Sequence, residues 1–312
     1  AESKKEILVK VLAISYPNSN TSVPPPKTTN FDIGLASCGR DIFIIDERKG
    51  MKPLPETILG FERFFGLDYF FALEDLPDVD EIYLPIGGGG LAAGTVIAIK
   101  EKNPNVKVIG VQSKSFPSMY ESVKQNTRTL TGGGDRTIAD GISVKMPGEI
   151  TFDIIKNRID EIVLVDDDEI TKAMFLLMER MKFVVEPAGA VGLAYLISKK
   201  PSPGKKVVAV LAGGNVDMYL LGQIVDKGLA AMSRLLKLSV LLPDRPGAFK
   251  EIVDIITLAN ANIVEVVHDR LSSDVNAGSA SVTLNLETQG KDQAQSLIKS
   301  LKENNVQFKL LT

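Results

Sequence analysis

The chain has 312 residues, of which 44% are hydrophobic and 24% are charged, so it can bury a sizeable core and is long enough for two domains. Its formal net charge is −3, and this slightly acidic balance argues against nucleic acid and anionic membranes as partners. No apolar run is long enough to span a bilayer and the first residues lack a signal-peptide pattern, so we expect a cytoplasmic protein.

Residues 1–71 have the least regular pattern of the chain. Residues 7–14 are predicted to form a strand or a short helix, and residues 41–46 a strand. Between them, residues 18–30 are rich in Ser, Thr, Asn and Pro, which is typical of an extended loop. We treat this stretch as a divergent N-terminal segment.

Four consecutive glycines, Gly87, Gly88, Gly89 and Gly90, stand between a short apolar run rich in β-favouring residues and a small, apolar helical pattern. A strand-to-helix turn without Cβ atoms lets backbone N–H groups converge on an anion near the positive end of a helix. A plain glycine-rich turn is the alternative. Because the Lys and Ser or Thr of a nucleotide-binding loop are absent, we predict a phosphorylated cofactor held by the backbone.

From residue 73 onward, predicted strands alternate with predicted helices. The strands are expected at 82–85, 106–111, 162–165 and 207–211, and the helices at 91–101, 117–125, 168–181 and 187–199. This alternation predicts an α/β fold with a parallel sheet covered by helices on both faces. Ligands of such sheets bind beyond the carboxyl ends of the strands, where the four glycines and residues 212–215 both lie.

Cysteine and histidine each occur once, as Cys38 and His268. Disulfides, cysteine-rich zinc sites and iron–sulfur clusters need more than one thiol, and a serine–histidine–aspartate triad would have only His268 as its base. A lone cysteine is more often an inert small residue than a nucleophile. We therefore predict no metal site and expect the chemistry to come from lysines, carboxylates or a cofactor.

Four separated motifs resemble one known family in their order along the chain. They are Pro85-Ile86 with the four glycines, Thr137-Ile138-Ala139-Asp140-Gly141-Ile142, the run from Val185 to Gly192, and Gly213-Gly214-Asn215-Val216-Asp217. This pattern resembles the serine/threonine dehydratases, also called ammonia-lyases, which are fold-type II pyridoxal-phosphate enzymes. The resemblance covers about three quarters of the chain and implies pyridoxal 5'-phosphate as the cofactor.

The resemblance also implies roles for individual residues. The four glycines would hold the cofactor phosphate, and Ala212, Gly213 and Gly214 would lie near the pyridine ring. Glu186 would lie beside the ring and orient a ring substituent or take part in proton transfer. Its alternative role is that of a helix-start carboxylate before Pro187. Asp140 and Gly141 would shape the edge of the pocket, although a plain turn explains them equally.

The chain departs from the family in three places. The Ser-Phe-Lys-x-Arg-Gly segment, whose lysine joins the cofactor covalently, is not found, and neither is the Ser-Ala-Gly-Asn-His loop that holds the substrate carboxylate. Lys27 and Glu186 remain the candidates for a catalytic residue. Ala212 replaces the family's serine, whose hydroxyl faces the pyridine nitrogen. The stretch before the four glycines is short, which implies that the family's small domain is reduced or replaced.

Residues 233–312 are predicted to form a second unit with β-α-β-β-α-β order, the ferredoxin-like plan. The Asp-Arg-Pro-Gly turn and an asparagine at the second strand resemble an ACT domain. Such domains pair and bind amino acids, so the resemblance implies a homo-oligomer and an effector site with Asp244, Gly247 and Asn262 as candidates. A turn and a strand cap explain these residues as well.

Three parts are therefore expected: a divergent segment 1–71, a dehydratase-like domain 72–232 and an ACT regulatory domain 233–312. The resemblance implies an L-threonine or L-serine ammonia-lyase that dehydrates and deaminates its substrate to a 2-oxo acid under allosteric control. The alternative is a non-catalytic relative that acts as an amino-acid sensor or partner subunit.

Overall fold

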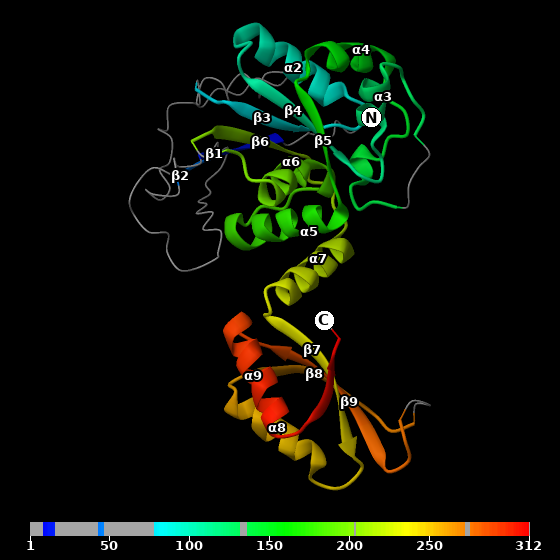
Figure 1. Ribbon diagram of the computed structural model, residues 1–312, viewed down its shortest axis with the longest axis vertical. Helices are drawn as coiled ribbons and strands as arrows, with labels where there is room; N and C mark the ends of the chain where they lie inside the picture. Colours follow the sequence, from blue (N-terminus) through cyan, green and yellow to red (C-terminus); the bar gives the residue numbers. More distant parts are fainter. Residues whose placement is uncertain are drawn as a thin grey trace, which may run out of the picture. The chain divides into compact units, whose positions relative to one another are not determined.

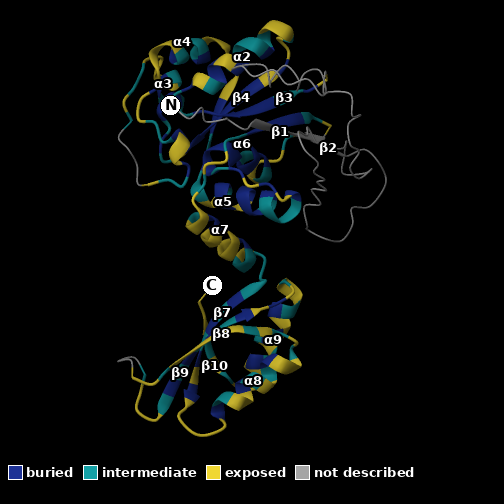
Figure 2. Ribbon diagram, turned by 180° about the vertical axis from the view of Figure 1, so that it is seen from behind, coloured by how far each residue is buried: buried dark blue, intermediate teal, exposed yellow. Residues whose placement is uncertain are grey.

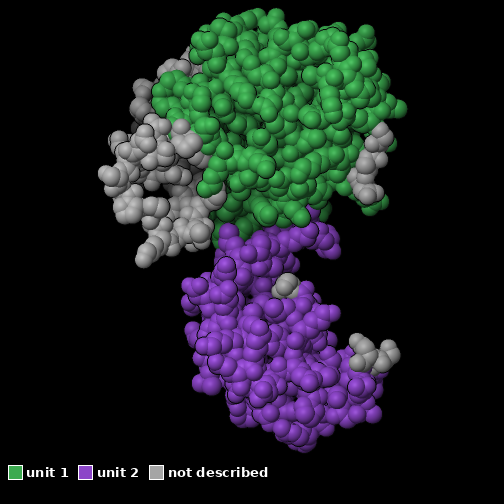
Figure 3. Space-filling model, viewed as in Figure 1, with its two compact units in different colours: residues 1–218 green, residues 219–312 purple. Residues whose placement is uncertain are grey.

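The computed structural model divides the chain into two compact units, residues 1–218 and residues 219–312 (Figure 3). The domain boundary expected from the sequence lay at 232/233, so helix α7 (Met218–Ala231) is grouped almost entirely with the second unit. The structure describes residues 9–15, 43–46, 78–131, 136–202, 204–271 and 275–311. The predicted loop 18–30, with Lys27, lies outside these ranges.

The first unit is built on a six-stranded sheet with the order β2-β1-β6-β3-β4-β5 (Figure 1). Its strands are β1 (Val9–Ser15), β2 (Phe43–Asp46), β3 (Glu81–Pro85), β4 (Lys107–Ser113), β5 (Glu161–Val165) and β6 (Lys206–Ala212). Strands β6, β3, β4 and β5 are parallel, as predicted. The sheet is not parallel throughout, because β1 pairs antiparallel with β6 and β2 runs parallel to β1.

Helices cover both faces of this sheet (Figure 1). They are α2 (Gly90–Lys102), α3 (Ser118–Gln125) and α4 (Glu149–Arg158) on one face and α5 (Asp167–Leu176) and α6 (Pro187–Ser198) on the other. The α-helix predicted over 168–181 ends earlier, and its last turn is a π-helix, η2 (Leu177–Met181). Helix α4 and the short 3-10 turn η1 (Asp140–Ile142) were not predicted.

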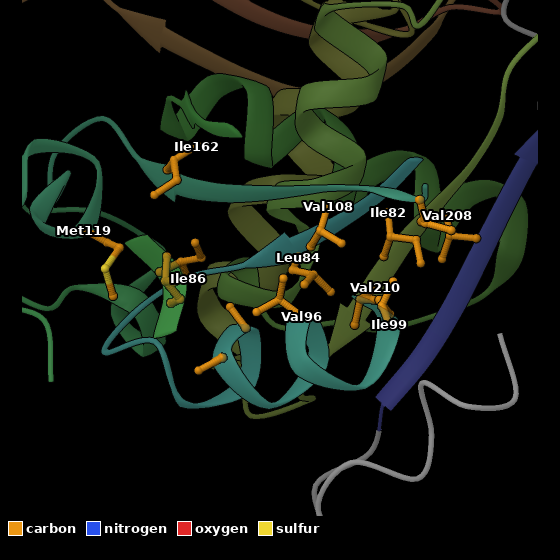
Figure 4. Close-up of a cluster of buried hydrophobic side chains, with 14 of the residues drawn as sticks. Ile82, Leu84, Ile86, Val96, Ile99, Val108, Met119, Ile162, Val208 and Val210 are labelled. Carbon is orange, nitrogen blue, oxygen red and sulfur yellow. The ribbon is translucent and has the colours of Figure 1, made fainter. Parts of the chain in front are cut away.

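The core between the sheet and α2 buries one face of β3. Ile82 and Leu84 of β3 and Ile86, which follows the strand, alternate along the chain, belong to the same buried cluster as residues of α2 and are at most 1% exposed (Figure 4). Strands β3 and β4 are buried almost throughout (Figure 2). Burying each such side chain contributes about 1.5–3 kcal/mol, which holds the carboxyl end of β3 in place.

The second unit has the predicted ferredoxin-like order. Its elements after α7 are β7 (Leu235–Pro243), α8 (Ala248–Leu258), β8 (Asn262–Asp269), β9 (Ser279–Glu287), α9 (Lys291–Glu303) and β10 (Gln307–Leu310). The strands pair antiparallel in the order β10-β7-β9-β8. Alternate residues of β7 and β9 are buried, since the helices cover one face of the sheet.

Within the described ranges, no helix has both the length and the apolar character that crossing a bilayer requires.

Candidate functional site

The two glycine-containing turns predicted from the sequence lie at the same edge of the sheet. Strands β3 and β6 are parallel neighbours in which Tyr83 pairs with Ala209. Gly87 and Gly213 each follow four residues after these partners, beyond the carboxyl ends of their strands. This is the edge at which open α/β sheets bind ligands.

The four glycines form the turn from β3 into α2. Gly89 is the N-cap of α2 and has a φ of 96°, a left-handed conformation that glycine adopts without strain. Among the described residues, no acceptor receives a hydrogen bond from the backbone N–H groups of residues 87–92. The turn therefore offers several unused donors at the positive end of a 13-residue helix, an arrangement suited to a phosphate group.

Two further predicted segments contact this turn or each other. A Cβ atom placed on Gly87 would lie 3.1 Å from the Cα of Ile142, so η1 lies directly against the first glycine. A Cβ on Gly141 would lie 3.3 Å from a carboxylate oxygen of Glu186. A Cβ on Gly213, whose φ is 79°, would lie 2.2 Å from the carboxylate carbon of Glu186. The segments that contain Gly141 and Gly213 thus meet at this carboxylate, and η1 also contacts the glycine turn.

Glu186 is half-buried and is the N-cap residue of α6, but its side chain makes no capping hydrogen bond. Instead, its carboxylate accepts a hydrogen bond from the backbone N–H of Asn215 at 3.2 Å. Burial raises the pKa of Glu186; the hydrogen bond from Asn215 opposes this rise and the charge of Asp140 adds to it. A carboxyl group in this setting can hold or release a proton at a higher pH than an exposed glutamate.

Replacing Glu186 with glutamine is expected to raise the melting temperature at pH 7.5 in the cofactor-free protein. A raised folded-state pKa means that ionisation of Glu186 opposes folding. This penalty is absent below the usual 4.5 and grows as the pH rises through the raised pKa. Melting curves from pH 4 to pH 8 should therefore show an advantage of Glu186→Gln that disappears on acidification. The exposed Glu101→Gln is the control, and a Glu186→Gln variant less stable than the parent at pH 7.5 would contradict the expectation.

Ala212 is the last residue of β6 and is half-buried beside the core of the unit. Helix α6 approaches it closely, because a Cβ on Gly189 would lie 1.7 Å from the carbonyl oxygen of Ala212. Gly214 is exposed, and a Cβ there would meet no atom of the described ranges within 4 Å. In the segment 212–215, Ala212 is therefore packed closely against α6, whereas Gly214 borders open space.

The three effector candidates of the second unit do not come together within one chain. Gly247 is the N-cap of α8 with a φ of 90°, and Asp244 forms an ion pair with Arg270 at 3.3 Å. Asn262 begins β8 after the other end of α8 and lies 3.4 Å from a carboxylate oxygen of Glu287. On β9, Ser279 pairs with Pro243 at the end of β7, and Glu287 pairs with Asn262. At the rise of a β-strand, the residues from Ser279 to Glu287 separate Asn262 from the turn that contains Asp244 and Gly247 by roughly 27 Å.

Asn262 instead lines an open polar cavity of about 610 Å³ within the second unit. The other lining residues are Arg234, Asn260, Glu287, Thr288, Gln289 and Gln293. This cavity carries one cationic and one anionic side chain, which suits a small zwitterion.

Sequence reasoning missed a residue that fastens the 137–142 segment to the rest of the unit. Asp167, at the start of α5, accepts hydrogen bonds from the Thr137 hydroxyl at 2.6 Å and the Ile138 N–H at 3.0 Å. The only local signal was the acidic run in the first turn of α5, which is also what an ordinary helix start contains. Thr137, which donates to Asp167, belongs to the 137–142 motif of the family resemblance, but the sequence does not show that these two residues form a hydrogen bond.

Comparison with known proteins agrees with the resemblance of the first unit to pyridoxal-phosphate enzymes. Residues 54–213, which are 160 of the 312 residues, match the family model described as pyridoxal-phosphate dependent enzyme. An L-threonine ammonia-lyase of Thermotoga maritima is 43% identical over 234 residues, covering 75% of this chain and 57% of the relative. An L-threonine ammonia-lyase of Geobacter sulfurreducens is 44% identical over 245 residues, covering 78% and 60%.

A solved structure, the processed form of threonine deaminase isoform 2 from Solanum lycopersicum, is 32% identical with a TM-score of 0.48, covering 51% of this chain and 47% of that one. The chain spans about three fifths of the length of the two curated relatives. The 234 matched residues exceed the 218 residues of the first unit, so the similarity extends into the second unit. Since the family model covers just over half of the sequence and includes the four glycines and Glu186, the chain belongs to the pyridoxal-phosphate dependent enzyme family.

Proposed function

We propose that this chain acts as an L-threonine or L-serine ammonia-lyase that uses pyridoxal 5'-phosphate. The observation that supports the proposal most strongly is the meeting of Gly87, η1, Glu186 and Gly213 at one edge of the sheet. The names of the two curated relatives support the same reaction and substrate class. The expected cofactor agrees with the family to which the chain belongs.

The residues at this edge fit the proposed cofactor. Backbone donors of residues 87–90 would hold its phosphate, since they have no acceptor among the described residues. Gly214 is exposed and its Cβ position meets no described atom within 4 Å, which would leave room for a flat ring near Glu186. When bound, pyridoxal phosphate serves as an electron sink for negative charge at the substrate Cα. Ala212 has no hydroxyl, so this position donates no hydrogen bond to the ring nitrogen.

In this proposal, Glu186 holds a proton beside the bound ring. Its raised pKa keeps more of the carboxyl protonated near neutral pH than an exposed glutamate would be. The Asn215 N–H orients the carboxylate, and the close fit of Gly213 and Gly141 keeps it in place. The chain thus supplies a fixed proton-carrying group and a fixed anion site at the same sheet edge.

The test is an assay of the full chain with pyridoxal phosphate and L-threonine or L-serine, in which formation of a 2-oxo acid and ammonia is measured. Borohydride reduction followed by peptide mapping would identify the lysine to which the cofactor is attached. The proposal expects both products in equal amounts and one labelled lysine. No product and no labelled lysine, at saturating cofactor, would overturn the activity.

A non-catalytic amino-acid sensor is the second candidate, because the second unit has a ferredoxin-like fold with a polar cavity. We infer that this unit is an ACT-type regulatory domain in either case. A bound effector should raise the melting temperature through mass action. If none of the twenty amino acids, at millimolar concentration, shifts the melting of the full chain, the regulatory assignment is wrong.

The exposed edge of the second unit supports pairing with a second copy of the chain. Strand β8 is at the edge of the sheet, and Val264, Val266 and Val267 are 60%, 42% and 51% exposed. Among the described residues no strand pairs with the outer edge of β8, and an apolar edge strand of this kind is a template for pairing with another strand. Sedimentation of the full chain as a monomer at micromolar concentration would contradict this inference.

A further inference from the structure

Two donors hold the carbonyl group of Gly88, in the middle of the four glycines. The Thr151 hydroxyl donates to it at 2.6 Å, and the backbone N–H of Gly148 donates to it at 3.2 Å. Both donors belong to the first turn of α4, whose N-cap is Gly148. The start of α4 therefore holds the glycine turn in place, although Thr151 lies 63 residues after Gly88 in the sequence.

Fixing this carbonyl also fixes the direction of a neighbouring donor. A peptide unit is planar and trans, so the N–H of Gly89 points opposite to the carbonyl of Gly88. Once the carbonyl faces α4, the N–H of Gly89 must face away from α4, and no described residue accepts a hydrogen bond from it. Because glycines restrict φ and ψ so little, this peptide plane depends on outside contacts for its orientation.

Helix α4, which holds the glycine turn, is itself held by core packing and by hydrogen bonds just before its start. Phe152 and Ile155 of α4 belong to the buried cluster that also contains residues of β3 and α2. The guanidinium of Arg128 donates two hydrogen bonds, at 3.2 Å and 3.0 Å, to the carbonyl of Pro147. Thr151 thus donates to Gly88 from the start of a helix that is packed into the core and not from a loop.

We propose that Thr151 is a positioning residue for cofactor binding: its hydroxyl holds the Gly88 carbonyl and thereby aims the Gly89 N–H at the cofactor phosphate. This inference rests on the proposed role of residues 87–90 as the phosphate site. In this proposal Thr151 acts through the orientation of one peptide group and not through contact with the phosphate or the reacting atoms.

The experiment compares Thr151→Val with the parent by calorimetric titration of the full chain with pyridoxal phosphate, with inorganic phosphate as competitor. Losing one hydrogen bond of this kind is worth about 1 kcal/mol, so affinity should fall about five- to tenfold. Thr151→Ser keeps the hydroxyl and should bind within about twofold of the parent by the same reasoning. Pyridoxal, which lacks the phosphate, should bind parent and Thr151→Val equally.

Thr95→Val is the matched control, because its hydroxyl donates to the Leu91 carbonyl within α2 and not to the glycine turn. It should leave the affinity for pyridoxal phosphate unchanged. If Thr151→Val fails to fold, Thr151→Ala replaces it, since alanine favours the helix and differs from Thr151→Ser only in the hydroxyl.

The outcomes separate this inference from the proposal on which it rests. If Thr151→Val binds pyridoxal phosphate like the parent while Gly88→Val does not bind it, Thr151 has no positioning role and the phosphate site stands. If neither variant changes binding, the phosphate site itself is wrongly assigned. Equal losses in Thr151→Val and Thr151→Ser would also overturn the role of the hydroxyl.

Discussion

Gly88→Val is expected to abolish binding of pyridoxal phosphate without unfolding the protein. Gly88 does not have a positive φ, and a Cβ there meets no atom of the described residues within 4 Å, so the β-carbon of the new side chain fits the folded backbone. It would occupy the open space beside the backbone donors and keep the phosphate from reaching them. Hydrogen bonds to a charged group are worth about 1.5–3 kcal/mol each, so losing two corresponds to at least a hundredfold weaker affinity, about 3 kcal/mol.

Calorimetric titration of the full chain measures this effect, and melting curves verify that the variant is folded. Gly94→Val is the matched control, since Gly94 is an exposed residue of the same helix with no atom within 4 Å of its Cβ position. It should bind the cofactor like the parent. Cofactor binding by Gly88→Val at the parent's affinity would show that the four glycines are not the phosphate site.

Gly189→Ala is expected to cause the largest loss of stability of any glycine-to-alanine change among the described glycines of the first unit. The added Cβ would lie 1.7 Å from the carbonyl oxygen and 2.7 Å from the carbonyl carbon of Ala212. Both groups are main chain of packed elements, so α6 must move away from β6. Overpacking of this kind costs typically about 1–3 kcal/mol, and we expect the upper end. For a domain of this size the melting temperature should fall by roughly 6–12 °C.

Thermal melting of the full chain tests this value, with Gly94→Ala as the control. Gly94 has open space around its Cβ position, and alanine there should leave stability unchanged or raise it by up to about 1 kcal/mol. An unchanged melting temperature for Gly189→Ala would mean that α6 and β6 do not approach as closely as the structure shows.

Local sequence patterns predicted most of the elements because burial leaves a clear signature in them. The run Val207-Val208-Ala209-Val210-Leu211 has no polar face and forms a strand covered on both sides. Leu235–Leu242 alternates and forms a strand covered on one side. Helix α4 was missed because Ile150, Phe152 and Ile154 alternate like a strand, while its main buried residues are Phe152 and Ile155.

The sequence by itself determined that glycine-rich turns follow two buried strands, and the parallel sheet then places Gly87 and Gly213 at one edge. Only the tertiary structure decided what surrounds them. The Glu186 carboxylate bonds to the Asn215 N–H rather than capping its own helix, and Thr151 holds Gly88 from 63 residues away. Such contacts depend on how α4 and α6 pack against the sheet. A pattern of neighbouring residues carries no information on that packing, because the free energy that sets it is spread over the whole buried core.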